Sequence, residues 1–94
     1  MRMPEIIADT QLQAALLSLP AWKLEQGELT RTVVFQDFKQ AMGFVNRVAE
    51  LAEAKGHHPD IDIRYNKVRL GLVTHDAGGI TEKDLRLAQE IERN

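Results

Sequence analysis

The chain has 94 residues, of which 44% are hydrophobic and 28% are charged, and its net charge at pH 7 is -2. This length and balance predict a single folded domain over residues 1–94 and are not typical of a disordered chain. The slight acidic excess argues against direct nucleic-acid binding, and no apolar run is long enough to predict a membrane span. Cysteine is absent, so the chain has neither disulfides nor a thiol nucleophile, which suits a cytoplasmic protein.

The first elements predicted along the chain are a leader over residues 1–8 and a short helix. Asp9 or Thr10 can cap this helix, and Pro20 ends it. Its apolar residues recur at helical spacing, at Leu12, Ala15, Leu16 and Leu19.

A hairpin is predicted next, because apolar residues alternate from Trp22 to Phe35 on both sides of a turn at Gln26 and Gly27. Trp22 is expected in the core, since large aromatic side chains dominate small cores. Arg31 is the polar exception on the buried face of this hairpin.

A second, longer helix is predicted to begin at Asp37, where Gln40 completes a start similar to a capping box, and to end at Lys55 and Gly56. Its apolar stripe is wider than one contact requires, because Phe44 and Leu51 broaden it. We therefore expect a second neighbour for this helix, either another helix of the chain or a partner subunit, with the partner slightly favoured.

A second hairpin follows, in which the apolar alternation changes parity between Tyr65 and Val68. A two-residue turn at Asn66 and Lys67 explains the change and predicts a register for the two strands. In that register Tyr65 opposes Val68 on the packed face, Ile63 opposes Leu70, Ile61 opposes Leu72, and beyond them His58 opposes His75. The register thus predicts that all three histidines of the protein converge, since His57 lies beside His58.

The last helix is predicted to start at Thr81, with Asp84 three residues later completing the N-terminal cap, and to present Leu85, Ala88 and Ile91 to the core. The element order is therefore α-β-β-α-β-β-α. We predict an α+β, two-layer domain with a four-stranded antiparallel sheet and three helices on one face.

The three histidines allow three interpretations. Histidines and carboxylates can bind zinc, although the side chains of adjacent histidines diverge on an extended backbone. A His-His-Pro loop can also be nothing more than the polar base of a hairpin. The third interpretation is a proton-transfer site, because imidazole exchanges protons near neutral pH and no activated nucleophile lies in this stretch. The predicted convergence of His57, His58 and His75 favours proton transfer.

The residues from Glu53 to Asp84 resemble a known family signature. Glu53, His57, His58, Pro59, Tyr65, His75 and Asp84 occur with the spacing E-x3-H-H-P-x5-Y-x9-H-x8-D. This string resembles the signature of pterin-4a-carbinolamine dehydratases, and Phe35-Gln-Asp-Phe38, Gly43-Phe44 and Tyr65-Asn66-Lys67-Val68 also look like that family. The resemblance is strongest from Trp22 onward.

The resemblance implies a hydro-lyase that converts 4a-hydroxytetrahydropterin to quinonoid dihydropterin and water, with no metal and no organic cofactor. It also implies a homodimer or homotetramer. His57, His58 and His75 would be catalytic, with His57 and His75 exchanging protons and His58 mainly holding the pterin. Glu53 would orient His57, and the remaining substrate contacts would come from Asp60, Val73, Thr74 and Asp76.

The sequence departs from the family pattern at Ile61, where many animal members have tryptophan after an acidic residue. An apolar pocket wall would then lack aromatic stacking, which would affect pterin affinity or choice and not the proton chemistry. Animal members also serve as dimerisation cofactors of a homeodomain transcription factor. The resemblance therefore implies a second candidate, a non-catalytic interaction module, although such a module would not require Glu53 and three histidines at these spacings.

Overall fold

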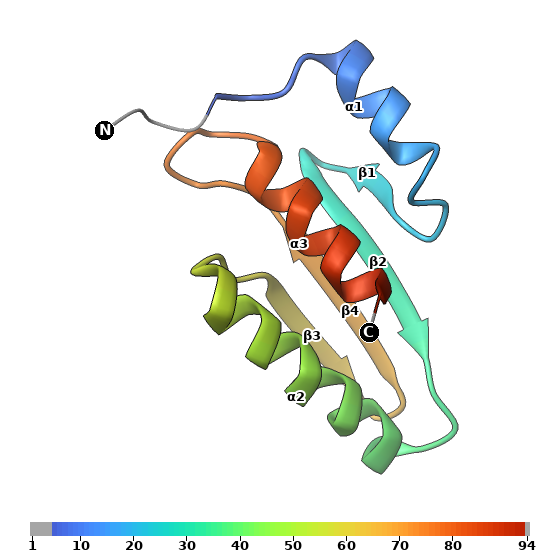
Figure 1. Ribbon diagram of the computed structural model, residues 1–94. Coiled ribbons are helices and arrows are strands. Elements are labelled where there is room, and N and C mark those ends of the chain that lie inside the picture. Colours follow the sequence, from blue (N-terminus) through green and yellow to red (C-terminus); the bar gives the residue numbers. More distant parts are fainter. Residues whose placement is uncertain (1–4, 94) are drawn as a thin grey trace.

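The computed structural model describes residues 5–93, which form three helices and four strands in the predicted order (Figure 1). The residues before Glu5, including part of the predicted leader, and Asn94 lie outside the described range. The elements are α1 (Asp9–Leu16), β1 (Lys23–Glu25), β2 (Glu28–Val34), α2 (Phe38–Lys55), β3 (Asp60–Arg64), β4 (Lys67–Leu72) and α3 (Glu82–Arg93). No helix within residues 5–93 is long and apolar enough to cross a membrane.

The four strands form one antiparallel sheet in the order β1-β2-β4-β3. Figure 1 shows α2 and α3 side by side across one face of this sheet, with α1 near its β1 end. The α+β architecture predicted from the sequence is therefore confirmed. The hairpin turn at Gln26 and Gly27 is confirmed as well, since both residues have the positive φ angles, 50° and 78°, of a tight hairpin turn.

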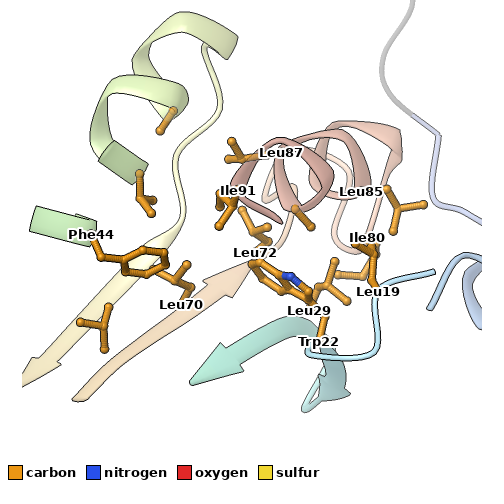
Figure 2. Close-up of a cluster of buried hydrophobic side chains, with 14 of the residues drawn as sticks. Leu19, Trp22, Leu29, Phe44, Leu70, Leu72, Ile80, Leu85, Leu87 and Ile91 are labelled. Atoms are coloured by element: carbon orange, nitrogen blue, oxygen red, sulfur yellow. The ribbon is translucent and has the colours of Figure 1, made fainter. Parts of the chain in front are cut away.

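The core lies between the sheet and the helices, and Figure 2 shows Leu70, Leu72 and Leu29 of the strands beneath Leu87 and Ile91 of α3. Alternate strand residues supply the sheet side of this core because successive side chains point to opposite faces. Trp22 is 4% exposed, as predicted for a core aromatic, and Leu12 and Leu19 extend the core toward α1.

Arg31, the polar residue on the packed face, is explained by a contact with the last helix. Its guanidinium lies 2.8 Å from Oε1 of Glu92, and the same oxygen accepts a hydrogen bond of 2.8 Å from the indole of Trp22. The guanidinium carbon also lies 5.8 Å from the centre of the Phe44 ring. A charge on the core side is tolerated because it is paired.

The predicted boundaries of α2 are confirmed, whereas α1 ends at Leu16 and not at Pro20. Asp37 accepts a hydrogen bond of 2.8 Å from the backbone of Gln40 and caps α2, and Gly56, at φ 64°, ends that helix in the left-handed conformation. The cap predicted for α1 was wrong. Ala8 occupies that N-cap position and makes no side-chain hydrogen bond, and Asp9 already lies in the first turn.

The predicted register of the second hairpin was wrong: each residue of β3 pairs with a β4 residue two positions earlier than predicted. Arg64 pairs with Lys67, Ile63 with Val68 and Ile61 with Leu70, so the turn residues are Tyr65 and Asn66. Asn66 explains the difference. Its side-chain amide donates to the carbonyl of Phe35, and its own carbonyl accepts from the Phe35 N–H, which ties the turn to the end of β2.

Two further consequences follow from that turn. Tyr65 has φ 53° and is 65% exposed, so the expectation that it lies on the packed face was wrong. The strand pairing also stops at Asp60 and Gly71, so His58 and His75 are not cross-strand partners. Both histidines lie in loops beyond the ends of the paired strands.

The second neighbour expected for α2 is present within the chain, because α3 packs against α2. Ala41, Phe44, Val45, Val48 and Ala52 of α2 are buried. Met42 and Leu51 remain half-buried, and Phe38 is 50% exposed. Part of the wide apolar stripe of α2 is therefore satisfied by α3, and part of it still faces outward.

The opposite face of the sheet carries mainly polar and charged residues, and no helix within residues 5–93 covers it (Figure 1). Its central Thr30 is buried, and the Thr30 hydroxyl donates a hydrogen bond of 2.7 Å to the carboxylate of Glu25. This hydrogen bond, with smaller contributions from Lys23 and Arg69, lowers the pKa of Glu25 below its ordinary value.

Candidate active site

The C-terminus of α2 places the first two histidines. The left-handed Gly56 reverses the chain, and the N–H of His57 donates to the carbonyl of Ala52, a 3.2 Å bond of the Schellman type. Pro59 favours an extended backbone at His58. His57 and His58 thus leave the helix end in adjacent positions of a loop that the cap fixes.

The third histidine lies in the loop that follows β4. Thr74 closes this loop, since its N–H donates to the carbonyl of Gly79 at 3.0 Å and its carbonyl accepts from the N–H of Gly78 at 2.9 Å. Gly78 has φ 78°, a conformation that glycine adopts without strain. His75 and Asp76 lie exposed within this closed turn.

The two loops enclose one hollow of about 280 Å³. Figure 1 shows the end of α2 and the loop after β4 at the same edge of the molecule. The residues that line the hollow are Gly56, His57, His58, Val73, Thr74, His75, Asp76 and Lys83. Six of the eight predicted site residues therefore lie around one hollow, and the three histidines do converge, although not through strand pairing.

Glu53 and Asp60 are the two predicted site residues that do not line the hollow. Asp60 is exposed at the first position of β3. Glu53 contacts a histidine, but not the one expected. Its Oε2 lies 2.5 Å from Nε2 of His58, so the prediction that Glu53 orients His57 was wrong. Both members of this pair are mostly exposed.

His57 is oriented by Asp84 instead. Its Nε2 lies 2.5 Å from Oδ1 of Asp84, and the Asp84 side chain is fully buried. With Asp84 as a carboxylate, which only accepts hydrogen bonds, the ring carries its hydrogen on Nε2. Nδ1 is then the nitrogen of the neutral ring that can accept a proton.

Asp84 is held in turn by two threonines. Its Oδ2 accepts from the hydroxyl of Thr74 at 2.8 Å and from the backbone N–H of Thr81 at 2.9 Å. The two threonine hydroxyls lie 2.7 Å apart, and Oγ1 of Thr81 also accepts from the N–H of Lys83. The N-terminal cap of α3 therefore fixes a carboxylate whose other oxygen faces His57.

Thr74 lines the hollow and also has a second, structural part in the site. Its hydroxyl, N–H and carbonyl all take part in hydrogen bonds within the protein. Thr74 thus connects the loop of His75 to the carboxylate behind His57. Within residues 5–93, by contrast, no hydrogen bond engages the side chain of His75.

Lys83 and the second contact of Asp84 were not among the predicted features of the site. Asp84 was visible as the last residue of the signature string, but the local pairing of Thr81 with Asp84 explained it fully as a helix cap. The contact between Asp84 and His57 spans 27 residues, and no periodic pattern encodes it. In the part of the chain that the structure describes, no group of three or more His, Asp or Glu side chains is arranged to hold a metal ion.

Fold and site together define a small α+β protein with three imidazoles around one hollow, one of them backed by a buried carboxylate. Such an arrangement is suited to proton transfer. A family model described as pterin 4 alpha carbinolamine dehydratase matches residues 5–94. The chain belongs to this family and, like the members that give the family its name, is a hydro-lyase.

Similar chains support this assignment over most of their length. A protein of Acidobacterium capsulatum named "Putative pterin-4-alpha-carbinolamine dehydratase" is 65% identical over 81 residues, which cover 86% of this chain and 88% of that protein. A protein of the same name from Chloroflexus aurantiacus is 53% identical over 90 residues and covers 96% of both chains.

Solved structures show the same fold. The crystal structure of a transcriptional coactivator/pterin dehydratase from Brucella melitensis superimposes with a TM-score of 0.89 at 32% identity, covering 95% of this chain and 97% of that one. A pterin dehydratase-like protein identified as a RuBisCO assembly factor in the alpha-carboxysome has a TM-score of 0.61 at 22% identity, covering 77% of this chain and 83% of that one. The second likeness concerns the fold alone.

Proposed function

We propose that the protein dehydrates 4a-hydroxytetrahydropterin to quinonoid dihydropterin by histidine general acid and base catalysis. The observation that supports this function best is the gathering of His57, His58 and His75 around one hollow, with Asp84 buried behind His57. The volume of about 280 Å³ is close to the lower end of small-molecule sites, roughly 300 Å³, and suits a bicyclic ring.

The reaction requires two proton transfers. The bond between C4a and its hydroxyl breaks as an acid protonates the departing oxygen, which leaves as water. A base removes the proton from N5, and the electron pair of the N–H bond forms the double bond between N5 and C4a. His57 and His75 carry these two protons, and since Asp84 occupies Nε2 of His57, the exchange falls to Nδ1 of that ring.

The remaining residues bind and frame the substrate. His58 holds the pterin ring and is itself supported by Glu53. The Asp76 carboxylate, together with the backbone at Val73, meets the 2-amino and N3–H donors at the polar edge of the ring. Thr74 forms the wall behind them, and Asp60, which does not line the hollow, has at most a peripheral part in binding. No organic cofactor takes part, and the reaction runs in the cytoplasm.

The test is to mix the protein with freshly generated 4a-hydroxytetrahydropterin and to follow quinonoid formation by ultraviolet absorbance. We expect acceleration over buffer, and its absence would refute the dehydratase function. A double variant, His57→Ala with His75→Ala, should lose nearly all of the acceleration. Full activity in that variant would refute the assigned proton carriers while leaving the reaction itself standing.

We also infer that the protein is a homodimer or homotetramer joined through α2. Phe38 of this helix is 50% exposed, and Met42 and Leu51 are half-buried, so an apolar strip remains beside α3. The same strip supports the alternative function of an interaction module. Light scattering gives the oligomeric state, and a monomer would refute self-association. The absorbance assay is then applied to the same sample, and an oligomer without dehydratase activity would favour the interaction module.

A further inference from the structure

A second hollow of about 150 Å³ adjoins the histidine site, and it has an unusual lining. Lys55, His57, Lys83 and Arg86 line it. His57 and Lys83 also line the first hollow, so the two hollows meet at these residues. Three permanent cations therefore gather on one side of His57 in a protein whose net charge is -2.

The cationic cluster of Lys55, Lys83 and Arg86 comes from two elements. Lys55 is the last residue of α2, whereas Lys83 and Arg86 are three residues apart in α3 and thus share one face of that helix. Within residues 5–93, the side chains of Lys83 and Arg86 form no ion pair, and Lys55 has only a 4.0 Å contact with Glu90. No carboxylate lines this second hollow.

We propose that the cationic cluster is a subsite for an anionic group, such as a phosphate ester, carried on the C6 side chain of the pterin substrate. The proposal rests on the proposed function. In a pterin, C6 is bonded directly to N5, the atom that loses its proton to a histidine. A side chain at C6 therefore leaves the ring beside the histidines, and His57 marks the boundary between the two hollows.

The charges of the two hollows fix the direction of the ligand. Asp76 lines only the first hollow and suits the donor edge of the ring, whereas Arg86 and Lys55 line only the second. Asp76 and these two cations thus lie in different hollows, with His57 and Lys83 shared between the two. Guanidinium and ammonium groups are the usual protein partners of phosphate oxygens. A substrate with a neutral side chain would offer no anionic partner to Lys83 and Arg86.

The first experiment compares two substrates, a 4a-hydroxytetrahydropterin with an uncharged C6 side chain and one whose side chain carries a phosphate monoester. We expect the wild type to show a higher kcat/KM for the phosphorylated substrate. In Lys55→Gln with Arg86→Gln the ratio of the two kcat/KM values should fall about five- to tenfold, since each lost charge pair at an exposed site is worth a few-fold. Added salt should reduce the wild-type ratio by screening.

The matched control is Lys39→Gln, at the opposite end of α2. Lys39 is exposed, and 16 residues at a rise of about 1.5 Å put it roughly 24 Å from Lys55 along the helix axis. This variant should keep the wild-type ratio. An equal ratio for the two substrates in the wild type, or an equal fall in the control, would overturn the subsite.

A second experiment works without catalysis. Inorganic phosphate is titrated into the ¹⁵N-labelled protein, and amide chemical shifts are followed by NMR. Saturable shifts at His57, Lys83 and Arg86 that vanish in Lys55→Gln with Arg86→Gln would support the subsite, and no such shifts would overturn it. Phosphate binding without any preference for the phosphorylated substrate would make the cluster a site for free anions and overturn the link to substrate. Binding in a protein inactive on both substrates would refute the dehydratase function, and with it the link to a pterin side chain, while leaving the cationic cluster as an anion site.

Discussion

Two histidine–carboxylate pairs lie at the same site with the same separation and opposite surroundings. In each pair Nε2 lies 2.5 Å from a carboxylate oxygen. The side chain of His57 is 13% exposed and that of Asp84 is 0% exposed, whereas His58 is 60% and Glu53 77% exposed. Judged by distance alone, the two pairs would be expected to contribute equally to stability and catalysis.

The difference in solvent exposure predicts unequal contributions from the two pairs. Water competes for both members of the exposed pair, and such pairs are typically worth about 0.2–1 kcal/mol. Asp84 has no access to water, so its oxygens depend on His57, Thr74 and Thr81 for their hydrogen bonds. The buried pair is therefore expected to fix one ring and the local fold together. The exposed pair is expected only to bias the position of its ring.

The largest expected difference is between His57→Gln and His58→Gln. Loss of a proton carrier should lower kcat by about 10²- to 10³-fold in the first variant. The second variant should mainly raise KM, by about five- to tenfold, because His58 holds the substrate. Steady-state rates of quinonoid formation give both parameters. Equal falls in kcat would show that the two rings share one role.

Asp84→Asn should have the next largest effect, because it removes the charge and leaves an amide group among buried donors. We expect the free energy of unfolding to fall by about 2–4 kcal/mol and kcat to fall about 10²-fold. Urea unfolding followed by the fluorescence of buried Trp22 measures stability, and the absorbance assay measures kcat. A stability loss below about 0.5 kcal/mol would show that burial does not distinguish the pairs.

The same contrast shows what the sequence could predict. Local signals were sufficient for the fold, because Asp37, Gly56 and the Gln26-Gly27 turn each define a boundary through contacts with their own neighbours in sequence. They failed at Tyr65, where the hydrogen bonds of Asn66 to Phe35 decide the turn from 31 residues away. The histidines could be predicted to converge because both loops leave the same edge of the sheet, which a shift of two residues does not alter.

The partners of the histidines were harder to predict than the histidines themselves. Glu53 precedes His57 by four residues and was the obvious local choice, yet the Schellman turn leaves Glu53 beside His58. Asp84 already satisfies a local rule as a helix cap, and no local pattern indicates a role for its second oxygen. Asp84 uses one oxygen to cap its own helix and the other to contact His57, which is 27 residues away. The sequence pattern indicates only the first of these contacts.

A smaller effect is expected for Thr74→Val, which keeps the shape of the side chain and removes one hydroxyl. The Thr74 hydroxyl lies 2.8 Å from Asp84 and 2.7 Å from the Thr81 hydroxyl, so its loss leaves both with one partner fewer. Stability should fall by about 1–2 kcal/mol and kcat by about three- to tenfold. Thr32→Val, on the exposed part of β2, is the matched control and should change neither. Equal behaviour of the two variants would show that the threonine pair does not support Asp84.

The smallest effect is expected for Glu53→Gln, the counterpart of Asp84→Asn at the exposed pair. Glutamine keeps the length and an oxygen acceptor, and water can replace whatever contact is lost, so stability should change by less than about 0.5 kcal/mol. We expect kcat/KM to fall by no more than about threefold, and the wild-type value to approach that of the variant as salt rises, because screening weakens an exposed pair. The Asp84→Asn effect should persist at the same salt concentration, since the buried carboxylate is beyond the reach of mobile ions. A large, salt-independent loss in Glu53→Gln would mean that His58 requires its carboxylate as strictly as His57 does, and exposure would then be a poor guide to the importance of either pair.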